Sequence, residues 1–193
     1  MVKTLSTMLP LGEQAPEFSL PDLDGTLMSL DSGSAEAKGH LVMFICNHCP
    51  FVVHIIKPLV DLCKQFQERG IQVIAINSND VDLYPADHPD RMKDFAKEHQ
   101  FSFPYLFDES QDVAKNYQAA CTPDFYLFDS SKRLVYRGQL DDSRPGNEKP
   151  VDGSDLRGAV DQLLAGQKPV ETQIPSMGCN IKWKPGQAPS WFG

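Results

Sequence analysis

Hydrophobic residues in the first half of the chain form short strand-like runs and one long helical pattern. Residues 17–20 and 26–30 alternate between apolar and polar positions around Asp24-Gly25, so they predict a β-hairpin with a tight turn. The apolar run at residues 41–45 is typical of a strand that is covered on both faces. Beyond it, apolar residues recur at helical spacing and predict an amphipathic helix that ends at Gly70. These residues are Val52, Ile55, Ile56, Leu59, Leu62, Cys63 and Phe66.

The second half of the chain predicts alternating strands and helices. Pro89 suits the first position of a helix, whereas Pro58, inside the first helix, removes one backbone hydrogen bond and is expected to kink it. The order strand, helix, strand implies that the first two buried strands run parallel. In chain order, the expected segments are a buried strand at 73–76, a helix at 90–99, an apolar segment at 103–107, a short helix at 112–117, an antiparallel hairpin of 125–128 with 134–137, and a last helix at 155–164.

The length of the chain favours one domain followed by an extension. A chain of 193 residues can bury a hydrophobic core without disulfides or metals, and we expect the domain to span residues 1–165, including the hairpin. Residues 166–193 are rich in proline but hold both tryptophans together with Ile174, Met177, Ile181 and Phe192. Disordered tails are poor in such side chains. We therefore expect a C-terminal extension that packs on the domain.

Composition and charge exclude several classes of function. The chain is 41% hydrophobic and 23% charged, as soluble globular proteins are. Its 18 Lys and Arg against 26 Asp and Glu give a net charge of −8, so we expect neither nucleic acid nor membrane as a partner. The longest apolar run, residues 41–46, is too short for a membrane span, and residues 1–11 lack the apolar stretch of a secretory signal. The expected location is cytoplasmic.

Cysteine spacing indicates redox chemistry. Five cysteines dispersed along the chain do not form the pattern of a disulfide scaffold. Only Cys46 and Cys49 have Cys-x-x-Cys spacing, and they lie between the predicted buried strand and the predicted long helix. A thiol at a helix N-terminus meets unpaired N–H groups and the positive end of the helix dipole. Both favour the thiolate form.

The order of the residues in the motif suggests their roles. We expect Cys46, which follows the strand directly, to be the more exposed thiol and the nucleophile, and Cys49 to resolve the mixed disulfide. His48 as a cation would stabilise the thiolate and make the disulfide more oxidising. Half of a zinc site is the alternative, but the sequence has no second Cys-x-x-Cys pair. Cys63 and Cys121 are expected to be core thiols.

Further segments carry a resemblance to a known family. Ala15-Pro16-Glu17-Phe18 and the Asp24-Gly25 hairpin precede the motif segment Phe44-Ile-Cys-Asn-His-Cys-Pro-Phe51, and Cys121-Thr122-Pro123 precedes the last predicted hairpin. In these features the chain resembles the thioredoxin superfamily, specifically the peroxiredoxin-like branch related to alkyl hydroperoxide reductase, thiol-specific antioxidant proteins and the membrane-tethered thiol-disulfide reductases of bacteria. The similarity extends from residue 15 to about residue 164.

The resemblance implies both a fold and a site. The fold is α/β, a thioredoxin fold with a central mixed sheet flanked by helices, an N-terminal β-hairpin extension and a C-terminal tail. The family implies a cis peptide before Pro123, in a loop that faces the cysteines and lets the main chain of Thr122 pair with an extended peptide. Arg137 matches a strand arginine that stabilises the thiolate in this branch, although an exposed strand residue fits it equally.

The expected activity is that of a thiol-disulfide oxidoreductase. It would exchange disulfides with protein or small-molecule substrates, be recycled by an unidentified reductant, and need no cofactor or metal. The alternatives are a thiol peroxidase that uses Cys46 and a non-enzymatic metal carrier that uses Cys46, His48, Cys49 and Cys179. Met43 stands where peroxiredoxins have the threonine that orients peroxide, so thiol peroxidase activity is expected less than thiol-disulfide exchange. Cys179 is either a third redox thiol or a buried anchor.

Overall fold

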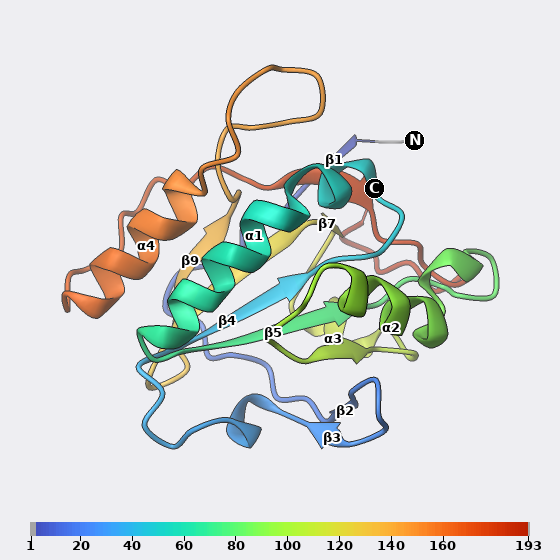
Figure 1. Ribbon diagram of the computed structural model, residues 1–193, viewed down its shortest axis with the longest axis horizontal. Coiled ribbons are helices and arrows are strands. Elements are labelled where there is room, and N and C mark those ends of the chain that lie inside the picture. Colours follow the sequence, from blue (N-terminus) through green and yellow to red (C-terminus); the bar gives the residue numbers. More distant parts are fainter. Residues whose placement is uncertain (1–2, 193) are drawn as a thin grey trace.

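A five-stranded mixed sheet forms the centre of the molecule (Figure 1). The computed structural model describes residues 3–192. Strand order in the sheet is β6-β5-β4-β8-β9, in which β4 runs parallel to β5 and antiparallel to β8. These elements are β4 (Gly39–Phe44), β5 (Ile71–Asn77), β6 (Tyr105–Phe107), β8 (Asp124–Asp129) and β9 (Leu134–Gly138). The expected parallel pair and the expected antiparallel hairpin are both confirmed.

Side chains of β4 alternate between two cores because successive residues of a strand point to opposite faces. Leu41 and Met43 join the core under α1, α2 and α4, whereas Val42 and Phe44 join the core under α3 and the N-terminal segment. The helices are α1 (Pro50–Glu68), α2 (Pro89–Glu98), α3 (Asp112–Asn116) and α4 (Ser154–Leu164). Both faces of the central strand are therefore covered, as its continuous apolar run predicts.

The long helix α1 starts directly after the cysteine motif. Cys49 is its N-cap residue, and Pro50 is well suited to the first turn because a proline has no backbone N–H to leave unpaired there. Phe51, Val52 and the later apolar positions are buried against the sheet. Pro58 lies on the exposed face of the helix, which continues without interruption to Glu68. The start of α1 thus fixes the position of Cys49.

The N-terminal segment covers the second core. The predicted hairpin is present but shorter than expected, with two residues in each of β2 (Leu20–Pro21) and β3 (Leu27–Met28). Buried side chains from this segment complete the core on the face of the sheet opposite α1: Leu9, Ala15, Phe18, Leu20 and Leu30. An additional strand, β1 (Lys3–Leu5), was not predicted because its three residues have no apolar alternation of their own.

The C-terminal segment is built into a second sheet. Strand β10 (Met177–Asn180) lies between β1 and β7 (Cys121–Thr122), antiparallel to both. Beyond it, Ile181 is only 1% exposed, and Trp183 packs edge-on against Trp191 and Phe192. Ile174 was expected to pack as well but is 51% exposed. The apolar side chains of the extension that pack on the domain are therefore those from β10 onward, whereas backbone hydrogen bonds such as that from Gln139 N–H to Ile174 O hold the segment before it.

Hydrogen bonds hold the segment after β10 in place. Asp80 N–H donates to Lys182 O at 2.8 Å, and Lys182 N–H donates to Asn79 Oδ1 at 2.9 Å. The side chain of Gln111 also donates to Lys182 O, at 2.8 Å. The polar residues that follow β5 therefore anchor the C-terminal segment. Among residues 3–192, no helix has both the length and the apolar character needed to cross a membrane.

We predict that truncation after Ala165 lowers the melting temperature by at least about 5 °C. The truncation removes β10 and the buried Ile181, whose burial alone is worth about 1.5–3 kcal/mol, and each kcal/mol shifts the melting temperature of a chain of this size by about 2–4 °C. A shorter truncation after Gly186 keeps β10 and serves as the control. Thermal unfolding followed by circular dichroism gives the comparison; equal melting temperatures for the two truncated chains would contradict the role of β10.

Candidate active site

The two motif cysteines lie at the junction of β4 and α1. Cys46 follows the strand and Cys49 caps the helix, as the sequence predicts. Neither thiol is exposed, although Cys46 was expected to be the more accessible of the two, since Cys46 is 1% and Cys49 is 0% exposed. Both sulfur atoms are covered because the loop of Thr122 and the strand that contains Cys179 lie over them.

The proline loop faces the motif, and the peptide bond between Thr122 and Pro123 is cis. The hydroxyl of Thr122 lies 3.2 Å from Cys46 Sγ, and the Cys49 thiol lies 3.2 Å from Thr122 O. Thr122 therefore contacts both motif cysteines, one through its side chain and the other through its main chain. The geometry implied by the family resemblance is present in the molecule.

A third thiol completes the cluster. Cys179 comes from β10, and its Sγ lies 2.7 Å from that of Cys49, within hydrogen-bond distance. Cys179 is the direct antiparallel partner of Thr122 and is 3% exposed. The proline loop thus lies between the motif and a cysteine that is 130 residues from Cys49 along the chain.

Hydrogen bonds to Cys49 decide which cysteine is ionised. The thiols of Cys179 and Cys46, followed by the backbone N–H groups of Val52 and Cys179, lower the pKa of Cys49 far below its usual range, although burial opposes this. The contact with Cys49 and then burial raise the pKa of Cys46, and the nearby Asp87 carboxylate raises it further. These contacts therefore favour ionisation of Cys49 over ionisation of Cys46.

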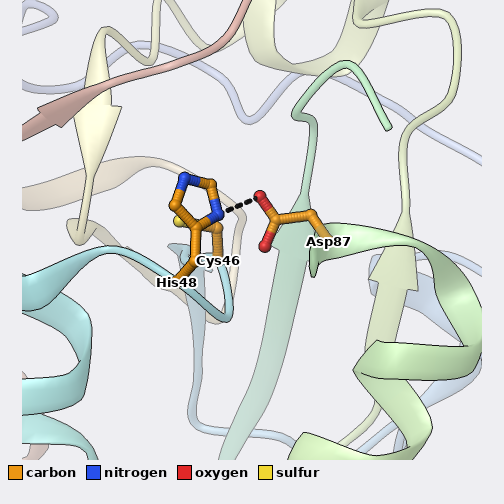
Figure 2. A group of neighbouring side chains, drawn as sticks. All are labelled: Cys46, His48 and Asp87. Atoms are coloured by element: carbon orange, nitrogen blue, oxygen red, sulfur yellow. Dashed lines mark ion pairs between the residues drawn. The ribbon is translucent and has the colours of Figure 1, made fainter. Parts of the chain in front are cut away.

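His48 forms an ion pair with an aspartate from another element (Figure 2). Its Nδ1 lies 2.8 Å from Oδ2 of Asp87, which ends the short turn Pro85–Asp87 and is fully buried. The hydrogen bond to Asp87 raises the pKa of His48. The ring of His48 also stacks on that of Tyr84, with 5.9 Å between centroids. This pairing favours the imidazolium form that the sequence analysis expected.

Asp87 was missed in the sequence, yet it organises the motif loop. Its Oδ1 accepts a hydrogen bond from Asn47 N–H at 2.8 Å, and its Oδ2 accepts one from the side chain of Asn79 at 2.7 Å. No local pattern distinguishes it from the other aspartates of the chain. The one signal in the sequence is the polar Asn79, which lies directly after the end of the buried strand β5.

The cluster of Cys46, His48 and Asp87 offers one ligand atom from each residue, all within 4.8 Å of one another. This donor set is one that zinc accepts. A metal takes cysteine as thiolate, however, and the raised pKa of Cys46 opposes its ionisation. These three residues would hold a metal if one were bound, but their protonation suits redox chemistry better.

Some of the expected residues lie away from the cluster. Arg137 was expected to stabilise the thiolate, but its guanidinium donates to Leu9 O at 2.6 Å and to the side chain of Gln173 at 2.7 Å. It therefore joins β9 to the N-terminal and C-terminal segments instead. Cys63 and Cys121 are fully buried, in agreement with the expected core positions, and burial raises the pKa of both.

A buried acid lies next to the proline loop. Asp124 starts β8 and pairs in register with Phe44 of β4, two residues before Cys46. Its side chain is fully buried and accepts a hydrogen bond from Tyr126 OH at 2.9 Å. Burial raises the pKa of Asp124 to about 7. Asp124 therefore places a buried carboxyl on β8, directly beside the strand that leads into the motif.

Comparison with known proteins identifies the class to which this fold and this site belong. The thioredoxin domain of a thiol-disulfide oxidoreductase from Bacteroides vulgatus superposes with a TM-score of 0.60 at 19% identity, covering 79% of this chain and 99% of that domain. The expected thioredoxin fold is thereby confirmed. Residues 11–137 match the AhpC/TSA family, and this match spans more than half of the chain. The chain belongs to the AhpC/TSA family, a peroxiredoxin-like branch of the thioredoxin superfamily.

Two other proteins show how similar this chain is to known sequences and structures. An uncharacterized conserved protein from Geobacillus kaustophilus is 51% identical and superposes with a TM-score of 0.92, covering 96% of this chain and 98% of that one. A protein named thiol-disulfide oxidoreductase ResA from Bacillus thuringiensis subsp. konkukian is 23% identical over 132 residues, which are 68% of this chain and 71% of the relative.

We predict that Asp124→Asn is less destabilising at pH 8 than at pH 5, by roughly 1–3 kcal/mol. The folded protein keeps the Asp124 proton up to about pH 7, whereas the unfolded chain loses it near 3.8. Between these values the folded state binds the additional proton, so this carboxyl makes the wild type less stable as pH rises. The amide does not titrate. Urea unfolding at the two pH values gives the difference, and an equal penalty at both would contradict the raised pKa.

Proposed function

We propose that the protein catalyses thiol–disulfide exchange, with Cys46 and Cys49 cycling between dithiol and disulfide. One observation carries the proposal: both sulfur atoms lie within hydrogen-bond distance of Thr122 in the proline loop, and Cys49 is the N-cap residue of α1. The AhpC/TSA family and the relatives named thiol-disulfide oxidoreductase support an oxidoreductase of the thioredoxin type. The proposed substrates are disulfides of proteins or small molecules.

The charge distribution favours Cys49 as the attacking thiol, which reverses the roles expected from the sequence. The Cys49 thiolate attacks one sulfur of the substrate disulfide, a mixed disulfide forms, and the first substrate thiolate leaves. Cys46 then attacks the Cys49 sulfur, the second substrate thiolate leaves, and the Cys46–Cys49 disulfide remains. The substrate is reduced by two electrons and the protein is oxidised by two. An external thiol reductant restores the dithiol.

The same charges explain how Cys46 becomes reactive at the second step. The largest cause of the raised pKa of Cys46 is its contact with Cys49. Once Cys49 is part of a mixed disulfide it no longer accepts that proton, so ionisation of Cys46 becomes easier at the moment when it must attack. The first step therefore prepares the second.

The peroxidase alternative lacks a supporting contact. Met43 occupies the position of the orienting threonine, and its fully buried side chain lies beside Cys63, with 3.8 Å between the two sulfur atoms. It offers no hydroxyl to a peroxide. The proposed thiol–disulfide exchange depends on contacts of Thr122 with Cys46 and Cys49, and both contacts are present.

We predict that Cys49 alone forms stable mixed disulfides. In Cys46→Ser/Cys179→Ser, Cys49 is the remaining thiol of the cluster, and glutathione disulfide should leave a persistent glutathione adduct on it because nothing nearby resolves the bond. In the matched variant Cys49→Ser/Cys179→Ser, burial and the Asp87 carboxylate still raise the pKa of Cys46, which should form the adduct more slowly. Mass spectrometry of the intact proteins over time gives both rates. Faster modification of Cys46 than of Cys49 would restore the roles expected from the sequence.

We also predict that His48→Gln makes the disulfide more reducing, by roughly 10–30 mV. The imidazolium of His48 stabilises the nearby thiolate of the reduced form, and Asp87 raises the pKa of this imidazolium. The effect is therefore present at pH 6 and fades as pH rises past the pKa of His48 in the folded protein. His54→Gln is the control, because His54 contacts Ser143 at 2.8 Å instead. Equilibration with glutathione buffers at several pH values measures the potential. Identical shifts in both variants would refute the electrostatic role of His48.

A further inference from the structure

Strand β10 occupies the edge of the proline loop where an extended peptide would pair. Cys179 is the register partner of Thr122, and Asn180 is that of Cys121, in antiparallel orientation. An incoming peptide strand that pairs with Thr122 needs the same main-chain groups. The C-terminal strand of this chain and a substrate strand therefore exclude each other.

The approach of β10 to the loop depends on a residue without a side chain. A Cβ atom at Gly178 would lie 2.0 Å from Thr122 O and 2.6 Å from its carbonyl carbon, which leaves no room for any other residue. The opposite edge of β10 pairs with β1, and Ile181 N–H donates to Ala120 O at 3.0 Å just after the strand. The strand is thus held on both sides with Cys179 directed at the motif.

The placement of Cys179 presents its thiol to the ionised cysteine. The two sulfur atoms are 2.7 Å apart, and the contact between them lowers the pKa of Cys49. A cysteine that served only as a packing anchor would not need to lie against Cys49, because apolar contacts would suffice. Here all three thiols are at most 3% exposed and lie in one group.

We propose that Cys179 is a third redox thiol, and that β10 is an internal substrate strand whose cysteine forms a disulfide with Cys49. The proposal rests on the function proposed above. Starting from the Cys46–Cys49 disulfide, the Cys179 thiolate attacks the Cys49 sulfur, the Cys49–Cys179 bond forms, and Cys46 leaves as a thiolate that takes up the proton given up by Cys179. The number of electrons on the protein is unchanged, so the exchange needs no outside oxidant.

The exchange links the redox state of the site to the position of the C-terminal strand. A Cys49–Cys179 disulfide ties β10 to α1 across the proline loop, so that a peptide cannot displace it. With the disulfide on Cys46 and Cys49, or with all three thiols reduced, β10 is held only by hydrogen bonds and packing and can give way to a substrate strand. The protein therefore admits peptide disulfides in only some of its redox states.

Disulfide mapping tests the third thiol. Full-length Cys46→Ser is oxidised with glutathione disulfide, alkylated, digested and analysed by mass spectrometry. The expected product is a Cys49–Cys179 peptide pair as the main disulfide; persistence of Cys49 as a glutathione adduct, with Cys179 alkylated, would overturn the proposal. Cys46→Ser/Cys63→Ser is the control and should give the same pair, since Cys63 is a buried core thiol.

A second variant tests the docking of β10 without changing any thiol. Gly178→Ala places a methyl group against Thr122 and should lower the yield of the Cys49–Cys179 pair about tenfold or more in the Cys46→Ser background, because β10 and the proline loop must move apart to make room for it. It should also speed alkylation of Cys49. Gly158→Ala adds the same methyl on α4, where nothing lies within 4 Å, and should change neither quantity. An unchanged yield in Gly178→Ala would refute the role of the strand.

Failure of this proposal and failure of the proposed function give different results. Cys179→Ser retains Cys46 and Cys49 and should still form their disulfide with glutathione disulfide. If that bond does not form, the proposed function is wrong. If it forms while Cys46→Ser yields no Cys49–Cys179 pair, only the third thiol is wrong. Recovery of the Cys49–Cys179 pair itself separates a redox role from a packing role, because packing alone does not join the two sulfur atoms.

Discussion

The packing of three buried thiols around one sulfur atom, that of Cys49, is the constraint on which the site depends. A buried ion is costly unless hydrogen bonds replace its lost water. Here the Cys49 sulfur obtains those bonds from Cys179, from Cys46 and from backbone N–H groups. Each donor comes from a different place in the fold: β10, the end of β4, and the first turn of α1. The ionisation of one cysteine therefore requires the correct packing of all these elements.

The ion pair of His48 and Asp87 provides the positive side of this arrangement. Asp87 receives hydrogen bonds from Asn47 and Asn79 besides its contact with His48, so one buried carboxylate orients the motif loop from the direction of β5. The same Asn79 accepts a hydrogen bond from Lys182 N–H just beyond β10. The motif loop and the C-terminal segment are consequently both held by Asn79, so that a change in the position of one alters the contacts of the other.

Much of the scaffold follows from local pattern. The continuous apolar run of β4, the helical spacing in α1 and the turn residues between β8 and β9 each state one preferred structure, and these elements appear close to their expected bounds. The Cys-x-x-Cys spacing and the Thr122-Pro123 dipeptide likewise identify two halves of the site. These patterns do not show how far a side chain is exposed to solvent, because that depends on distant segments of the chain. For this reason the expected exposure of Cys46 was wrong.

The sequence by itself determined the order of the main strands and helices, the two cores on either side of β4, and the redox motif, because these depend on residues that are neighbours or lie at regular spacing along the chain. Only the tertiary structure decided that Cys179 meets Cys49, that Asp87 meets His48, and that Arg137 lies elsewhere. Those contacts join residues far apart in the chain, and they arise where β10 pairs with β7 and where the turn before α2 approaches the motif. Which cysteine carries the charge is set by the same contacts, since a thiol is ionised by the groups that surround it in space.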